Sequence, residues 1–202
     1  MDIGFGSVIN PQIAEGKFPT LLGRENPLVR HYPKETVVAE KFEAVTNLGI
    51  RNSRIKDFYD LLYLARNFEF QGRELSQAIK ATFDHRGTEI PRINPVGLTT
   101  KFITYRKDRN KTWKKFYAEG AMGERPKFKE AIDEIAEFIM PVSQALAKDR
   151  LFNQNWTPRQ KWQLPPEFKF SEYQGEMEKI YPLPKSAKEQ STNQSQSKQE
   201  LD

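Results

Sequence analysis

Two stretches of sequence, PKETVVAEKFEAVTN at residues 33–47 and RIKDFYDLLYLARNF at residues 54–68, decide the fold class. Each carries apolar residues at about every third or fourth position, which is the period of an α-helix with one buried face. These positions are Val37, Val38, Phe42 and Val45 in the first stretch and Ile55, Phe58, Leu61, Leu62 and Ala65 in the second. Pro33 suits a first helical turn, Gly49 is a stop signal, and Ser53 is the expected cap of the second helix. Because the linker is short, the two helices should pack as antiparallel neighbours.

Helical periodicity continues beyond these two stretches. It predicts a third helix over about 72–85, one or two helices within 95–119, and a strong last helix over about 126–148. Pro141 lies inside the last pattern and is expected to kink that helix, because proline removes a backbone hydrogen bond. The sequence therefore predicts a mainly α fold, a helical bundle of roughly five to six helices with a short amino-terminal strand.

The segments around the helices differ from them in composition. Residues 1–32 are predicted to form a short strand, within 3–9, and then a loop rich in Pro and Gly. Residues 33–150 form the predicted helical domain. Residues 151–184 are expected to be an extended aromatic and proline-rich strap, and 185–202 a low-complexity, disordered tail.

The composition excludes several kinds of site. The 202 residues include no Cys and only two His, which excludes disulfides, thiolate metal sites, Cys nucleophiles and His-rich zinc sites. Any metal would be held by carboxylates, which favours Mg²⁺ or Mn²⁺. The formal net charge of +5 suits a nucleotide or nucleic-acid partner without selecting one. Since there is no run of roughly 18 apolar residues and no signal peptide, we expect a soluble, cytoplasmic protein without a membrane partner.

The two defining helices also carry the residues most suited to chemistry. Asp57 and Asp60 are three positions apart, so they share one face of the second helix. In an antiparallel pair, Lys41 of the first helix can meet Asp57. A partly buried Lys beside an Asp suits a phosphate site, because the Lys neutralises phosphate charge while the Asp can hold the Lys, bind a metal or accept a proton. The same residues could instead form a surface salt bridge worth well under about 1 kcal/mol.

The paired stretches YPKETVVAEKFEAV (32–45) and NSRIKDFYDLLYLA (52–65) resemble the paired motifs of the AbiEii/AbiGii nucleotidyltransferase toxin family. Its members are the enzyme halves of bacterial type IV abortive-infection toxin–antitoxin systems. ATFDHRGTEIP (81–91) and MDIGFGSVINP (1–11) are similar to further segments of that family. The resemblance runs from residue 1 to about 91 and, in helical pattern only, to about 150. It makes the predicted first strand a remnant of a nucleotidyltransferase α/β core.

The resemblance implies roles for the residues on the two helices. Lys41 would contact the nucleotide phosphates, and Asp57 would be the carboxylate essential for transfer. Asp60 and Arg54 would support Asp57, and Glu40 would orient Lys41. The implied reaction transfers nucleotides from a nucleoside triphosphate (NTP) to RNA, with tRNA as the target class. It uses Mg²⁺ or Mn²⁺, and an antitoxin protein is a possible partner.

The sequence departs from the family pattern near its amino terminus. Asp2 would match the third metal-binding carboxylate of the family's core. The family's core opens with a Gly-Ser turn and a strand bearing DxD or DxE, yet no such strand follows Gly6-Ser7, the only Gly-Ser dipeptide of the chain. We therefore expect an amino-terminally truncated chain that is impaired as a transferase. The alternative function is a catalytically dead helical module that binds the antitoxin or nucleic acid.

A basic stretch at 101–115 is interleaved with aromatic residues. Its basic residues are Lys101, Arg106, Lys107, Arg109, Lys111, Lys114 and Lys115, and Tyr105, Trp113, Phe116 and Tyr117 lie among or just after them. The pattern could be an RNA-binding face that combines phosphate contacts with stacking. It could also be a solvated helix face over buried aromatics, which is the commoner arrangement.

Overall fold

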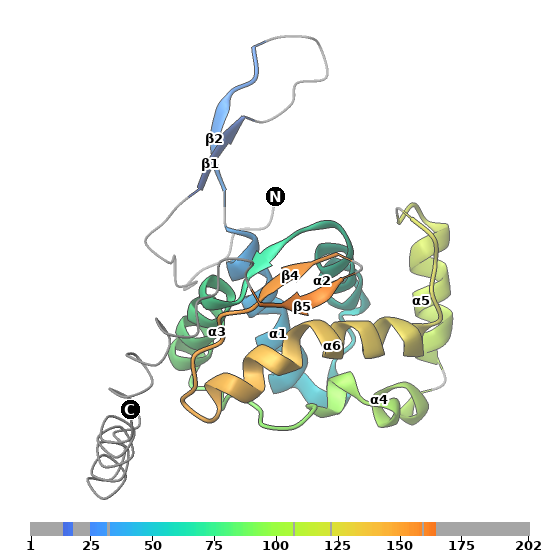
Figure 1. Cartoon of the computed structure of the whole chain (residues 1–202). Coiled ribbons are helices and arrows are strands. Elements are labelled where there is room, and N and C mark those ends of the chain that lie inside the picture. The colour runs from blue at the N-terminus through green and yellow to red at the C-terminus, as the bar shows by residue number, and fades with distance from the viewer. Residues whose placement is uncertain are drawn as a thin grey trace, which may run out of the picture. The chain divides into compact units, whose positions relative to one another are not determined.

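The computed structural model describes residues 14–17, 25–31, 33–106, 108–121, 123–158 and 160–164, and helices dominate this part of the chain (Figure 1). The α-helices are α1 (Lys34–Leu48), α2 (Ile55–Asn67), α3 (Gly72–Arg86), α4 (Thr100–Tyr105), α5 (Asp108–Ala118) and α6 (Phe128–Leu146). Two 3-10 turns, η1 (Gly49–Arg51) and η2 (Val96–Leu98), join them. The strands are β1 (Ala14–Lys17), β2 (Leu28–His31), β3 (Phe70–Gln71), β4 (Asn155–Thr157) and β5 (Lys161–Gln163). The predicted mainly α fold is confirmed.

Helices α1, α2, α3 and α6 surround the hydrophobic core. Helix α1 packs against α2 and α3, and α6 packs against the same two helices (Figure 1). Phenylalanine rings meet where the helices cross: Phe42 of α1 lies 5.3 Å from Phe83 of α3, and Phe58 of α2 lies 5.6 Å from Phe128 of α6, between ring centroids. These four rings are at most 2% exposed. The predicted apolar faces of α1 and α2 are therefore the buried faces, except that Val37 is only half-buried.

The segment between α1 and α2 is fixed by local geometry. Gly49 ends α1 at a positive φ of 50°, a conformation that favours glycine. The Asn52 side chain, 1% exposed, accepts a hydrogen bond of 2.8 Å from the backbone N–H of Arg54 just before α2. Ser53, the predicted cap, is exposed, and no side-chain cap hydrogen bond is formed at the start of α2. Asn52 is thus the residue that organises the entry to α2.

Two residues of the basic stretch belong to the core. Arg109 of α5 is 4% exposed and its guanidinium lies 3.6 Å from the ring centroid of Phe102. It donates to the backbone carbonyls of Phe102, Ile50 and Asn52. Trp113, 1% exposed, donates to the carbonyl of Pro126 over 3.0 Å. The structure therefore favours buried support over RNA contact for these two, whereas the lysines at 101, 111, 114 and 115 are exposed.

A small antiparallel sheet, in the order β3–β4–β5, covers part of α6. Trp156 pairs with Phe70 on one side and Trp162 on the other. Both tryptophan rings pack against Phe138 of α6, at 4.9 and 5.9 Å between ring centroids. Within the predicted strap, β4 and β5 therefore pair on α6, and residues 165–184 lie outside the described part, as does the predicted tail.

Strands β1 and β2 form a separate antiparallel hairpin, with Ala14 opposite His31 and Lys17 opposite Leu28. The sequence predicted a loop here, because the surrounding Pro and Gly are turn signals and strands of four residues carry too short a pattern to detect. The strand expected within residues 3–9 lies outside the described residues.

Candidate functional site

Lys41 of α1 lies between two carboxylates of α2. Its Nζ is 3.0 Å from Oδ1 of Asp57 and 2.7 Å from Oδ2 of Asp60. The two carboxylates are three positions apart, so both project from the same side of α2, and α1 packs against that helix. The predicted meeting of Lys41 with Asp57 is confirmed, and the structure adds Asp60 to the contact. We call Lys41, Asp57 and Asp60 the ion cluster.

The ion cluster is largely withdrawn from water. The side chains of Asp57, Lys41 and Asp60 are 3%, 19% and 23% exposed, respectively. Arg54, which is 60% exposed, brings its Nε to 2.9 Å from Oδ2 of Asp57. These exposures do not fit the simple surface salt bridge. Because burying charges costs several kcal/mol per ion, a buried pair such as Lys41–Asp57 is weak evidence of a stabilising role.

Neighbouring charges keep the Lys41 ammonium protonated. Burial by itself lowers the pKa of Lys41, but the hydrogen bond to Asp60 and the negative charges of Asp57 and Asp60 outweigh it. The net result is a pKa raised above the ordinary value of 10.5. Lys41 is therefore a fixed positive charge at neutral pH.

The ion cluster leaves hydrogen-bonding capacity unused. An ammonium has three N–H donors, and the two carboxylates occupy two of those of Lys41. Oδ2 of Asp57 is buried and accepts no hydrogen bond from the described residues, although the Arg54 Nε is near. Since buried polar atoms are normally satisfied, a Lys41 donor without a partner among the described residues, beside an oxygen paired only with the exposed Arg54 side chain, suits a ligand that carries both phosphate oxygens and a hydroxyl.

Glu40 and Asp2, the other two residues given a role by the sequence, are not part of the ion cluster. Glu40 is half-buried on α1, next to Lys41 in sequence, and its role in orienting Lys41 remains a prediction. Asp2, the predicted metal ligand, lies outside the described residues.

A divalent metal does not fit the described residues by themselves. No group of three or more His, Cys, Asp or Glu side chains in the described ranges is arranged to hold an ion. Asp57 and Asp60, the carboxylates nearest to a possible site, are both paired with Lys41. No chemical step can therefore be derived through a metal from these residues.

A second polar network, which sequence reasoning missed, lies two positions further along α1. Glu43 is 1% exposed and accepts hydrogen bonds from Arg86 over 2.5 Å, Thr88 over 2.7 Å and Asn47 over 3.1 Å. We call these four residues the Glu43 network. Arg86 and Thr88 belong to the stretch 81–91, which resembles a segment of the family. That resemblance was the sequence signal that could have pointed to these two residues. The network links the carboxyl-terminal end of α3 to α1.

No helix of the described ranges combines the length and hydropathy needed to cross a membrane.

In comparisons with known proteins, a family model described as "Nucleotidyl transferase AbiEii toxin, Type IV TA system" matches residues 1–137. The match includes the ion cluster and the Glu43 network. No curated protein and no solved structure matches the chain.

Proposed function

Since this chain belongs to the AbiEii family of nucleotidyl transferase toxins of type IV toxin–antitoxin systems, we propose that it transfers nucleotides from an NTP to RNA, with tRNA as the acceptor class. The single observation that supports the site of this reaction is the ion cluster. It places a charged ammonium on α1 beside the buried carboxylate of Asp57 on α2, whose Oδ2 is paired only with the exposed Arg54 among the described residues.

In the proposed reaction Lys41 binds a phosphate oxygen of the NTP. Its third N–H is the donor, and Asp57 and Asp60 hold the ammonium in place. A charge-assisted hydrogen bond to an oxyanion is roughly twice as strong as a neutral one. Because two neighbours already fix the Lys41 side chain, little rotational freedom is lost on binding.

Asp57 is proposed to accept, at Oδ2, the proton of the RNA hydroxyl as its oxygen bonds to the α-phosphorus of the NTP, while the α–β phosphoanhydride bond breaks and pyrophosphate leaves. Oδ2 of Asp57 lies beneath the exposed side chain of Arg54. An arriving phosphate would attract the Arg54 guanidinium, and this would uncover the oxygen. Asp60 is proposed to keep Lys41 charged and positioned when Asp57 takes up the proton, since its own contact with Lys41 is the shorter one, at 2.7 Å.

Mg²⁺ or Mn²⁺ belongs to the proposal as the ion that stabilises the attacking and leaving oxygens in such transfers. Asp2 is its proposed ligand, and none of the steps above depends on the ion. An antitoxin protein as partner and a cytoplasmic location complete the proposal.

The test is label transfer by the full chain. The purified protein is incubated with total tRNA, Mg²⁺ and each radiolabelled NTP in turn, beside Asp57→Asn and Asp84→Asn variants. Asp84 is the matched control, because it also pairs with a lysine, Lys80 at 2.8 Å, but both side chains are more than 60% exposed. We expect label on the RNA that is lost in Asp57→Asn and kept in Asp84→Asn.

Two outcomes would contradict the proposal. Equal labelling by Asp57→Asn would remove Asp57 from the reaction. Absence of label with every NTP would favour the catalytically inactive module that binds the antitoxin or nucleic acid.

A further inference from the structure

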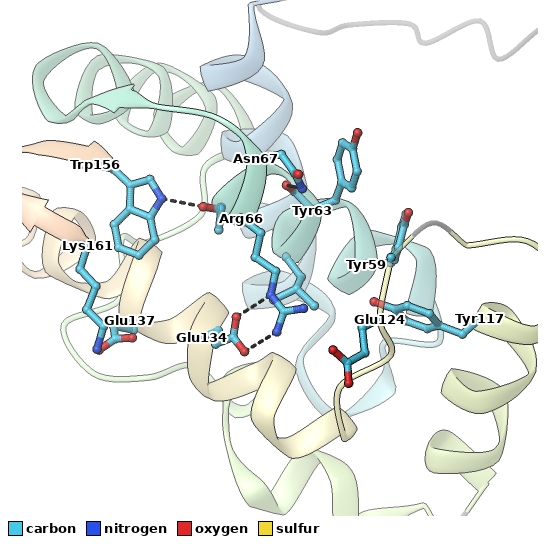
Figure 2. A pocket seen from close by; sticks show the side chains of 13 residues that line it. Tyr59, Tyr63, Arg66, Asn67, Tyr117, Glu124, Glu134, Glu137, Trp156 and Lys161 are labelled. Carbon is cyan, nitrogen blue, oxygen red and sulfur yellow. Dashed lines mark hydrogen bonds and ion pairs between the residues drawn. The ribbon is translucent and has the colours of Figure 1, made fainter. Parts of the chain in front are cut away.

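A pocket of about 880 Å³ lies on α2, and none of the residues of the ion cluster lines it (Figure 2). Its walls come from α2, α6, the end of α5, the segment before α6 and the β4–β5 hairpin. The volume is within the range of small-molecule sites, roughly 300–1,000 Å³. It is large enough for a nucleobase with its ribose.

Three tyrosines form the aromatic part of this pocket. The rings of Tyr59 and Tyr63, both on α2, lie 6.0 Å apart between centroids and are inclined by only 29°. Tyr117, at the end of α5, meets Tyr59 edge-on at 5.5 Å. Figure 2 shows the three rings on one side of the pocket, beside the Arg66–Glu134 pair. Such rings favour a flat ligand that can stack.

The charges of the pocket are nearly all used within the protein. Arg66 donates two hydrogen bonds to Glu134, at 2.7 and 2.5 Å, and Lys161 donates to Glu137 at 2.6 Å. Glu124 is exposed and its charge acts on Arg66, but within the described ranges it forms no hydrogen bond. The pocket therefore offers a stacking wall and a carboxylate acceptor, while both of its cations are paired with glutamates.

We infer that the pocket takes one base of the acceptor RNA strand, of the class that bears an exocyclic amino group: adenine, cytosine or guanine. This inference rests on the proposed function. Base–aromatic stacking contributes about 1–3 kcal/mol per base, and unstacked single-stranded bases are the usual target of tyrosine platforms. A glutamate accepts a hydrogen bond from a base amino group, whereas uracil presents a carbonyl there and would face the carboxylate with a lone pair.

The pocket and the ion cluster share α2 but use different faces of it. Tyr63 follows Asp60 by three positions, about 60° around the helix and about 4.5 Å along it, whereas Tyr59 is two positions from Asp57 and so about 160° away, on the opposite face. A base held by the tyrosines would therefore lie around α2 from Asp57, further along the strand from the reacting hydroxyl. Lys114, three positions before Tyr117 on α5, is exposed and can meet the phosphates outside the pocket.

Binding of short RNA without NTP or Mg²⁺ tests this inference separately from transfer. Fluorescently labelled tetranucleotides of adenosine, cytidine or uridine are titrated with the full chain at one fixed salt concentration, and the anisotropy is measured. We expect the first two to bind at least about fivefold more tightly than the uridine one, the equivalent of about 1 kcal/mol. Asp84→Asn, at the exposed pair on α3, should bind like the parent.

Paired variants sharpen the test. Tyr63→Leu should weaken adenosine and cytidine binding at least about fivefold, and Tyr63→Phe should keep it, because the ring remains. Glu124→Gln should abolish the discrimination against uridine, since an amide can donate to a carbonyl, whereas Glu89→Gln, an exposed carboxylate outside the pocket, should not. Circular dichroism and the melting temperature establish that each variant is folded.

The inference is overturned if uridine binds as well as the others, or if a folded Tyr63→Leu binds unchanged. It is also overturned if N-acetyl-arginine amide displaces the RNA from the parent but not from Glu124→Gln, which would assign the pocket to a cationic side chain of a protein. Loss of base discrimination with label transfer intact contradicts this inference alone. Discriminating binding without any transfer contradicts the proposed function alone.

Discussion

The ion cluster and the Glu43 network lie two positions apart on α1, and both bury a carboxylate almost completely. They differ in how fully the carboxylate is satisfied. Glu43 receives three hydrogen bonds, shared between its two oxygens. Asp57 receives one from Lys41 at Oδ1, and its Oδ2 forms, among the described residues, only an ion pair with the exposed Arg54 at 2.9 Å.

This difference distinguishes a structural network from a reactive one. A buried polar network that is fully satisfied rigidifies the fold and leaves no place for a ligand. A network whose buried oxygen is paired only with an exposed side chain can exchange that partner for a ligand. The Glu43 network should therefore control stability, whereas the ion cluster should control nucleotide binding and transfer.

The largest expected effect is on stability, from Arg86→Met. The variant leaves Glu43 charged and buried, with Thr88 and Asn47 as its remaining partners. Loss of one partner of a buried pair costs about 3 kcal/mol of unfolding free energy, to be measured by urea unfolding. Lys80→Met removes an exposed pair from the same helix and should be nearly neutral. Equal unfolding free energies for the two variants would show that the Glu43 network does not stabilise the fold.

The next effect is on substrate affinity, from Lys41→Met. Removal of a charge-assisted hydrogen bond to phosphate should raise the KM for the NTP about tenfold or more, and Lys41→Arg should recover part of the loss. Lys129→Met is the control, because Lys129 pairs with Asp133 at 2.6 Å on an exposed face. A KM that stays unchanged in Lys41→Met, with the enzyme folded and active, would separate Lys41 from the phosphates.

A smaller effect concerns the support of the ion cluster at the start of α2. Asn52→Ala removes the side-chain hydrogen bond to the Arg54 N–H and should lower the unfolding free energy by about 1 kcal/mol. Ser53→Ala, at the neighbouring exposed position, should change it by less than about 0.5 kcal/mol. The reverse order, from urea unfolding of both variants, would restore Ser53 as the cap.

The smallest effect is a pH dependence. Burial lowers the pKa of Lys41, but Asp60 and Asp57 raise it above the ordinary 10.5. A group whose pKa is higher in the folded state stabilises the fold fully below its unfolded pKa, and this contribution is lost as the pH rises through the folded pKa. The difference in unfolding free energy between the parent and Lys41→Met should therefore shrink above about pH 10.5. A difference that stays constant across that range would show that Lys41 is not stabilised by its carboxylates.

The long helices were predictable because their burial repeats over many residues. The stretch 33–47 gave α1 at Lys34–Leu48, and 72–85 gave α3 at Gly72–Arg86, each within one residue. The short strands were not, because two to four residues carry no usable period. Arg109 was grouped with its basic neighbours as a possible RNA contact. Its burial was not predictable, because it depends on three carbonyls supplied by α4 and the α1–α2 linker.

The residues of the candidate site also differ in whether the sequence predicts their contacts. The Lys41–Asp57 contact could be predicted, since a short linker brings neighbouring helices together and leaves few possible partners. Asp60 was expected only as a support. The Glu43 network could not be derived from spacing, because Glu43 and Arg86 are 43 positions apart and meet only through the packing of α1 on α3. The tyrosine pocket likewise needs α2, α5 and α6 in place before its residues converge.

The most direct measurement compares Asp57→Asn with Glu43→Gln, recording for each the initial rate of label transfer to tRNA per folded molecule and the unfolding free energy. The account predicts that Asp57→Asn lowers the rate at least about 100-fold while remaining folded, and that Glu43→Gln lowers stability but keeps the rate within a few-fold. A folded Glu43→Gln that no longer transfers, or an Asp57→Asn that transfers like the parent, would contradict the division between a structural network and a reactive one.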